Sequence, residues 1–148
     1  MIPEVIVTPL VTHSDDRGWF REIVRLSTLT ECKILHGRSN PGQLSWTLTH
    51  PGVIKAFHLH ERQDDVFCCV AGAIQLALVD LRGVRLEDYR DALGLDFHYG
   101  EGGMVRRSRP TFPDERIQTV FLSADDPKAV VVPAGVAHGL RVLGNTPA

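Results

Sequence analysis

The sequence predicts an all-β fold, a single domain built as a sandwich or barrel of short antiparallel strands. Two observations support this prediction. The apolar runs are short and rich in β-branched residues, which favour strands. Turn-forming residues are plentiful, with 13 Gly and 9 Pro among 148 residues. Many short strands separated by turn residues are typical of sandwiches and barrels.

Each expected strand is an apolar run that ends at a turn signal such as His50-Pro51-Gly52 or Pro133-Ala134-Gly135. The expected strands are Val5–Val7, Phe20–Leu26, Leu44–Leu48, Val53–Phe57, Val66–Val70, Ile74–Leu81, Ile117–Leu122, Ala129–Val132 and Leu140–Leu143. Helix signals are weak, and only Ser27–Glu31 and Leu86–Leu93 are candidates for short helical turns. Residues 83–107 are rich in Gly and charge, so we expect one domain over 1–148 with a loop insertion there.

Composition excludes several classes of protein. Lys and Arg number 16 against 18 Asp and Glu, a net charge of −2, so no basic excess drives binding to nucleic acid or to an anionic membrane. No apolar run approaches the ~20 residues of a membrane span, and the N-terminus lacks the features of a signal peptide. We therefore expect a cytoplasmic protein with a small-molecule partner.

Histidines stand at two turn-framed places. Gly52 is followed after five residues by His58-Leu59-His60, after four more by Asp65, and after six more by Gly72. On a strand, His58 and His60 point to the same face. A second cluster, Pro133-Ala134-Gly135-Val136-Ala137-His138, presents another imidazole beside a turn.

These two spacings resemble the two motifs of the cupins, with Asp65 where Glu is usual. The resemblance implies a cupin-type double-stranded β-helix, a jelly-roll barrel. It also implies that His58, His60, Asp65 and His138 bind one divalent transition-metal ion of unspecified element. The alternative is a metal-free barrel in which the same side chains bind one another and water.

Further segments resemble the dTDP-4-dehydrorhamnose 3,5-epimerase family. In chain order they are Asp16-Arg17-Gly18-Trp19-Phe20-Arg21-Glu22, Gln43-Leu44-Ser45-Trp46-Thr47, Gly52-Val53-Ile54-Lys55-Ala56-Phe57-His58, Val79-Asp80-Leu81-Arg82, Ser108-Arg109-Pro110-Thr111-Phe112 and Val132-Pro133-Ala134-Gly135-Val136-Ala137-His138-Gly139. Residues 83–107 have no counterpart in the resemblance.

This resemblance implies an epimerase or isomerase that acts on a nucleotide-linked 4-keto sugar, works without an organic cofactor and forms a homodimer. His58 would be the general base for a proton α to the carbonyl, and His138 would lie in the same pocket. The residues that would line the substrate groove are Arg17, Glu22, Gln43 and Lys55. Arg17 equally fits a turn residue ion-paired to Asp15 or Asp16, and Glu22 and Gln43 equally fit polar groups of the barrel interior.

The chain also departs from the family pattern. Ser45 replaces Asn, His60 replaces a Gln-like residue, and Asp65 stands near a position where the family carries Lys. The family's acid Tyr and its orienting Asp belong to a segment after Ala148, while Tyr89 and Tyr99 lie in the insertion. Three hypotheses therefore stand: a nucleotide-sugar epimerase, a metal-dependent cupin enzyme with another small substrate, and a non-catalytic sugar-binding barrel.

Overall fold

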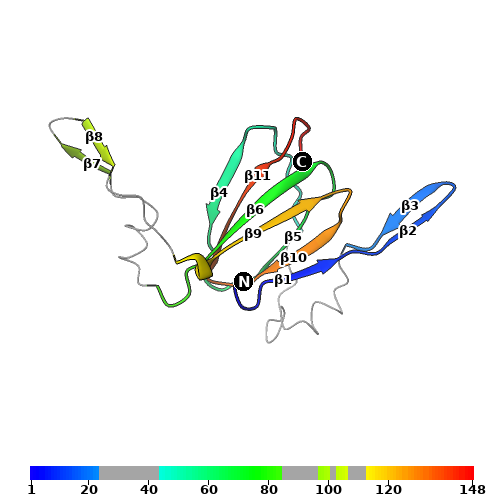
Figure 1. The fold of residues 1–148 in the computed structure, drawn as a ribbon, viewed down its shortest axis with the longest axis horizontal. Helices are drawn as coiled ribbons and strands as arrows, with labels where there is room; N and C mark the ends of the chain where they lie inside the picture. Colours follow the sequence, from blue (N-terminus) through cyan, green and yellow to red (C-terminus); the bar gives the residue numbers. More distant parts are fainter. Residues whose placement is uncertain (24–43, 85–96, 101–102, 107–112) are drawn as a thin grey trace.

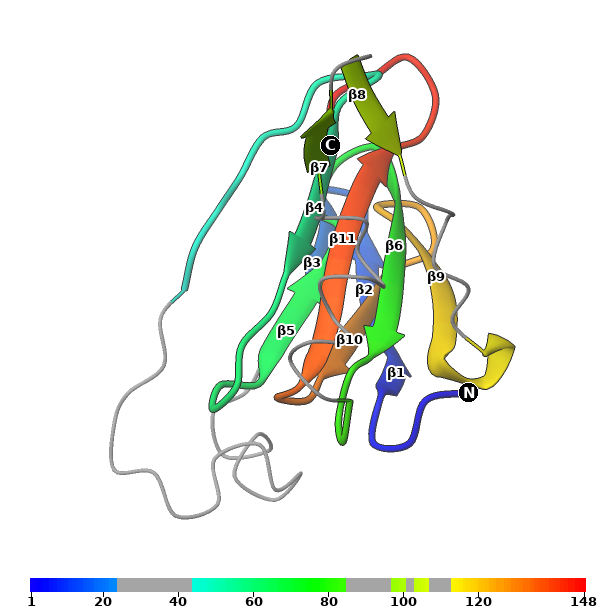
Figure 2. The same cartoon turned by 90° about the vertical axis from the view of Figure 1, so that its left-hand side faces the viewer.

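A computed structural model describes residues 1–23, 44–84, 97–100, 103–106 and 113–148. Two antiparallel sheets face each other across a common core (Figure 1). The smaller sheet has the order β1 (Ile6–Pro9), β10 (Lys128–Val132), β5 (Asp65–Cys68). The larger has the order β4 (Ile54–His58), β11 (Val136–Val142), β6 (Ala73–Asp80), β9 (Ile117–Ser123). The predicted all-β barrel is confirmed, and Figure 2 shows its two layers from the side.

The core lies between the inner faces of the two sheets. Alternation along β6 turns Leu76 and Leu78 inward, and both are fully buried. Val130 and Val132 of β10 close the core from the smaller sheet. Burying each of these side chains stabilises the fold by roughly 1.5–3 kcal/mol, so this apolar pairing holds the two layers together.

Two hairpins extend from the barrel on opposite sides (Figure 1). The first is β2 (Thr12–Asp15) with β3 (Gly18–Arg21), and the second is β7 (Phe97–Gly100) with β8 (Gly103–Arg106). Gly18 has a φ of +135°, which an L side chain rarely adopts. The second hairpin lies within the expected insertion at 83–107.

Several strand predictions need correction. Leu44–Leu48 forms no strand, and its Leu44 and Trp46 are 99% and 85% exposed. Apolar content alone did not indicate whether a partner strand was available. β11 begins at Val136, before the predicted start at Leu140, and this places His138 inside a strand.

Other predictions differ in extent or lie outside the described residues. β2 was missed because Thr12–Asp15 is polar and pairs through the tight turn that follows it. The run predicted at Phe20–Leu26 contributes only its first residues to β3. Both candidate helical turns fall outside the described residues. A short 3₁₀ turn, η1 (Asp114–Arg116), precedes β9.

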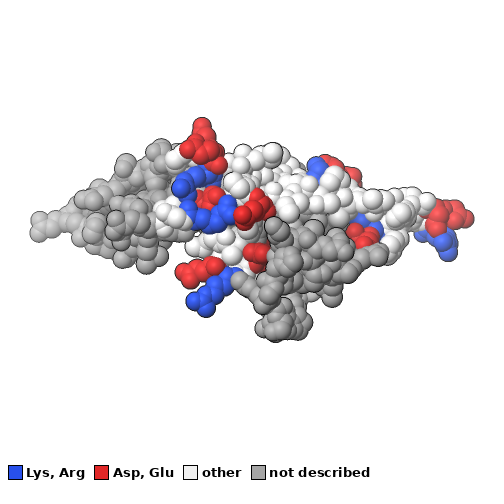
Figure 3. All heavy atoms as spheres, turned by 90° about the horizontal axis from the view of Figure 1, so that it is seen from below, with Lys and Arg blue, Asp and Glu red and all other residues white. Residues whose placement is uncertain are grey.

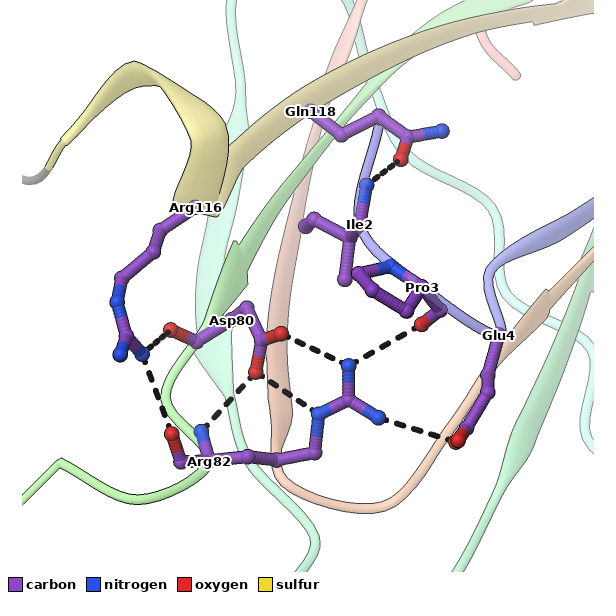
Figure 4. Close-up of polar contacts among 7 residues, drawn as sticks. All are labelled: Ile2, Pro3, Glu4, Asp80, Arg82, Arg116 and Gln118. Carbon is purple, nitrogen blue, oxygen red and sulfur yellow. Dashed lines mark hydrogen bonds and ion pairs between the residues drawn. The ribbon is translucent and has the colours of Figure 1, made fainter.

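A polar network joins the N-terminal segment to the end of β6 (Figure 4). The Arg82 guanidinium donates to both oxygens of Asp80, at 2.9 and 2.8 Å, and to the carbonyl of Pro3 and a carboxylate oxygen of Glu4. Arg116 donates to the carbonyl oxygens of Asp80 and Arg82. The network closes one end of the barrel with groups of both charges.

On the face seen from below, acidic and basic side chains lie beside one another over the described part of the surface (Figure 3). This mixture agrees with the near-neutral composition. Within the described ranges, no helix has the length and apolar character needed to cross a bilayer.

Candidate functional site

The histidines and Asp65 meet inside one end of the barrel because of strand register. His138 pairs with Leu78 in β6, so it shares the inner face with that buried leucine. On its other side, His138 pairs with His58 of β4. In the opposite sheet, Asp65 pairs with Val132, whose side chain also lies in the core. The two sheets therefore direct these groups toward the same interior space.

One carboxylate oxygen joins two of the imidazoles. Oδ2 of Asp65 lies 3.2 Å from Nε2 of His60 and 3.3 Å from Nε2 of His138. The three atoms, one from each residue, lie within 4.8 Å of one another. Three of the four predicted metal ligands are thus brought together.

His58 lies beside this group but outside it. Its ring stacks on that of His138 with the centroids 5.9 Å apart and the planes at 11°. The His58 residue is exposed, whereas His138 is buried. An imidazole at the mouth of the barrel, next to a buried one, can reach a bound molecule and exchange a proton with it.

Burial controls the charge of His138. Desolvation lowers its pKa, and the negative charge of Asp65 opposes that shift in part. The His138 side chain is 7% exposed, and its Nδ1 has no hydrogen-bond partner within the described structure. Phe67 covers one side, with a ring-to-ring centroid distance of 5.0 Å. His138 is therefore neutral near pH 7.

Two loops that carry site residues are bound to each other. The N–H of Gly135 donates to the carbonyl of His60 at 2.8 Å, and the N–H of Ala134 donates to Oδ1 of Asp64 at 2.8 Å. Asp64 thus joins the turn before β11 to the loop after β4. Sequence alone did not indicate this role, because the two segments lie far apart in the chain.

The residues assigned to the substrate groove lie in several places. Arg17 sits at the turn of the β2–β3 hairpin, where its guanidinium pairs with Asp15 at 2.5 Å, as one of the two sequence interpretations expected. Glu22 follows β3 and is exposed. Lys55 of β4 donates from Nζ to Thr47 Oγ1 at 2.7 Å. Gln43 lies outside the described residues.

Arg17 is thus separated from the histidines within one chain. The hairpin that carries it extends from the side of the molecule away from β4 (Figure 1). Lys55, by contrast, belongs to the same strand as His58. Of the two positively charged residues predicted to bind substrate, Arg17 and Lys55, it is Lys55 that lies on β4 with His58.

Comparison with known proteins gives consistent matches. A spore coat polysaccharide biosynthesis protein, SpsL of Bacillus subtilis, is 40% identical over 99% of this chain and 76% of its own length. A probable low-salt glycan biosynthesis epimerase, Agl13 of Haloferax volcanii, is 25% identical over 99% of this chain and 74% of its own. The solved structure of ChmJ, a 3'-monoepimerase from Streptomyces bikiniensis in complex with dTDP-quinovose, superposes with a TM-score of 0.68. It is 20% identical and covers 99% of this chain and 62% of that one.

The match to a family model identifies the class of protein. The model of dTDP-4-dehydrorhamnose 3,5-epimerase matches residues 1–87, which include the first hairpin, His58, His60 and Asp65. This match and the relative at 40% identity agree with the jelly-roll fold and the histidine-lined barrel. The non-catalytic sugar-binding barrel is therefore not supported, and the chain is a sugar-nucleotide epimerase belonging to the dTDP-4-dehydrorhamnose 3,5-epimerase family.

Proposed function

We propose that this enzyme inverts a carbon next to the keto group of a dTDP-linked 4-keto sugar, with His58 as the general base. The position of His58 carries the proposal. It is exposed at the barrel mouth and stacks on a buried, neutral His138. An imidazole that solvent and substrate can both reach is a suitable group for reversible proton transfer.

The proposed reaction needs no change of redox state. The carbonyl at C4 acidifies the hydrogens on C3 and C5. His58 takes one of these protons, and the bonding electron pair moves to form an enolate with its charge on the C4 oxygen. A proton from solvent then adds to the opposite face of the same carbon and inverts its configuration, and His58 releases the proton that it took to solvent. The pocket must therefore stabilise the developing negative charge on the C4 oxygen. It must also hold the sugar still while one face of the carbon loses a proton and the other face gains one.

His138 and Lys55 are the second and third groups of this proposal. A neutral His138 supports the ring of His58 by stacking and places no fixed charge behind it in the core. Lys55 lies on the strand of His58, and its ammonium already faces the oxygens of Thr47 and Leu48. A diphosphate could replace these neutral acceptors, because an ammonium binds phosphate as a point charge.

The test of this function is solvent exchange at the sugar. The full chain is incubated in deuterated water with dTDP-4-dehydrorhamnose or its C3 and C5 epimers, and the sugar is followed by proton NMR. We expect loss of the signal at C3, C5 or both, together with the appearance of an epimer. An unaltered spectrum, with a family enzyme active in parallel, would contradict the proposed activity on these sugars.

We also propose that the working form is a homodimer. The outer face of the larger sheet carries exposed Ile54, Phe57, Ile117 and Phe121, and a hollow of about 390 Å³ on this face is lined in part by Ala77 and Gly139. Exposed apolar faces of this kind mark association surfaces. A second copy of this chain suits the face, since it would also bring a second Arg17-bearing hairpin into the assembly.

Sedimentation equilibrium should give twice the 16.4 kDa chain mass, and Phe121→Glu should shift the protein toward the monomer.

The free cysteines favour a reducing compartment. Cys68 and Cys69 are free thiols on neighbouring positions of β5 and its end. Unpaired cysteines are typical of cytosolic proteins. We therefore propose a cytoplasmic location, which cell fractionation followed by the exchange assay would test. Activity confined to an extracytoplasmic fraction would contradict it.

A further inference from the structure

We propose that His60, Asp65 and His138 form a binding site for one divalent transition-metal ion. The site goes beyond the proposed epimerase function, which assigns no metal. It differs from the set expected from sequence in one respect, because His58 lies outside the group. The chemistry of the donors and their positions carry the proposal.

The distances within the group suit an ion. Two imidazole Nε2 atoms lie 3.2 and 3.3 Å from the same carboxylate oxygen. A tetrahedral ion with bonds of ~2.0–2.1 Å places its ligands about 3.3 Å apart. Small movements of the side chains would therefore bring all three atoms to bonding distance of a common centre.

The ligands are held by the fold, with support from neighbouring groups. Asp65 begins β5, and His138 lies within β11. The amide of Gln63 donates to Oδ1 of Asp65 at 2.8 Å, and this bond orients the carboxylate that presents Oδ2 to the imidazoles. His60 is fixed through its carbonyl by the N–H of Gly135.

The charge of Asp65 and the exposure of the three side chains also favour a bound ion. Among the described residues, Asp65 ion-pairs with these two imidazoles and with no Lys or Arg. Its side chain is 19% exposed, a position where an unneutralised carboxylate is costly. The exposed fraction rises from 7% at His138 to 39% at His60, so the group opens toward solvent on one side. An ion could enter from that side and keep open coordination positions there.

The donor set indicates the class of ion. Two imidazoles and one carboxylate suit Zn²⁺ and the other divalent first-row ions, whereas Mg²⁺ and Ca²⁺ prefer oxygen ligands alone. The stacked but separate His58 would stay free for proton transfer. Metal binding and base chemistry would thus use different side chains of one pocket.

The experiment measures metal binding directly, so its outcome does not depend on turnover. The full chain is stripped with a chelator and titrated with Co²⁺ by absorption spectroscopy and with Zn²⁺ by calorimetry. Asp65→Asn and His60→Gln each remove one ligand, while Asp125→Asn and His50→Gln, at exposed positions, are matched controls that keep all three. Circular dichroism and cooperative unfolding verify that each variant is folded.

We expect about one equivalent of ion per chain, with a Co²⁺ ligand-field spectrum, for the native protein and both controls. Affinity should fall by more than about a hundredfold in Asp65→Asn and His60→Gln, beyond the loss typical of removing an outer partner alone. Fewer than about 0.2 equivalents bound by the native protein, or equal affinity in Asp65→Asn, would overturn the proposal.

Discussion

At the scale of single residues, the site depends on which face of a strand each side chain occupies. His138 shares the inner face of the larger sheet because its register partner is the buried Leu78, and Asp65 faces it from the other sheet. The sequence spacing predicted this group, and the structure brings His60, Asp65 and His138 together. The separation of His58 was not predictable from the spacing: His58 pairs with His138 where β11 and β4 meet, yet its ring stacks on that of His138 and does not join the group.

Gly139 controls that same strand pairing. A Cβ at this position would lie 2.5 Å from the Cβ of Ala56 and 3.2 Å from the carbonyl oxygen of Lys55. Because the neighbours are backbone atoms and a methyl group, they cannot move aside cheaply. We expect Gly139→Ala to lower the free energy of unfolding by about 1–3 kcal/mol, measured by urea denaturation.

A second substitution separates this steric effect from other causes. Ala56→Gly removes the methyl group that would collide with the new Cβ. The double variant should therefore recover part of the lost stability, although the contact with the Lys55 carbonyl remains. A double variant less stable than the sum of the single changes would contradict the steric explanation.

At the scale of elements, the end of β6 is joined to the N-terminal segment by Asp80 and Arg82. The hydrogen bonds from the Arg82 side chain lower the pKa of Asp80 below its usual 3.8, because they favour the ionised carboxylate. A carboxylate whose pKa is lower in the folded state stabilises the fold above its unfolded pKa. That contribution is lost as pH falls through the lower, folded value.

Asp80→Asn tests this link. The variant keeps the shape of the side chain but loses the charge that Arg82 pairs with, so we expect a loss on the order of 2 kcal/mol at pH 7. The difference from native protein should shrink as the pH falls below about 4, because Asp80 is protonated first in the unfolded chain and only at lower pH in the folded protein. Thermal unfolding at a series of pH values would measure it. A difference that is independent of pH would contradict the ion-pair explanation.

The element predictions succeeded where burial and alternation coincide. β6, β9 and β10 were located to within a few residues because their apolar positions face the core. Leu44–Leu48 also contains alternating apolar residues but forms no strand, and β2 pairs although it is polar. Hydrogen bonding to a partner distinguishes these cases, and a partner distant in the chain cannot be read from a local pattern.

At the scale of the whole molecule, the β2–β3 hairpin and the histidines lie apart within one chain, while family resemblance assigns Arg17 to the substrate. A dimer in which each hairpin reaches the other copy would reconcile the two. Under this proposal Arg17→Ala and His58→Ala are each inactive alone. Refolded together in equal amounts, they should regain about one quarter of native activity, since half of the dimers would hold one intact site.

A mixture that stays inactive while each variant dimerises would show that Arg17 does not serve the partner's site. His13→Ala in place of Arg17→Ala is the control, because His13 lies on the same hairpin, outside every proposed contact with substrate. It should keep native exchange activity before mixing.

The central proposal is that His58 moves the proton. The most direct measurement compares deuterium incorporation into a dTDP-linked 4-keto sugar by native protein, His58→Asn and the control His50→Asn, all shown to be folded by circular dichroism. His50→Asn should exchange at the native rate, and His58→Asn should be slower by at least about a hundredfold, the usual contribution of a general base. Exchange by His58→Asn at the native rate would contradict the assignment.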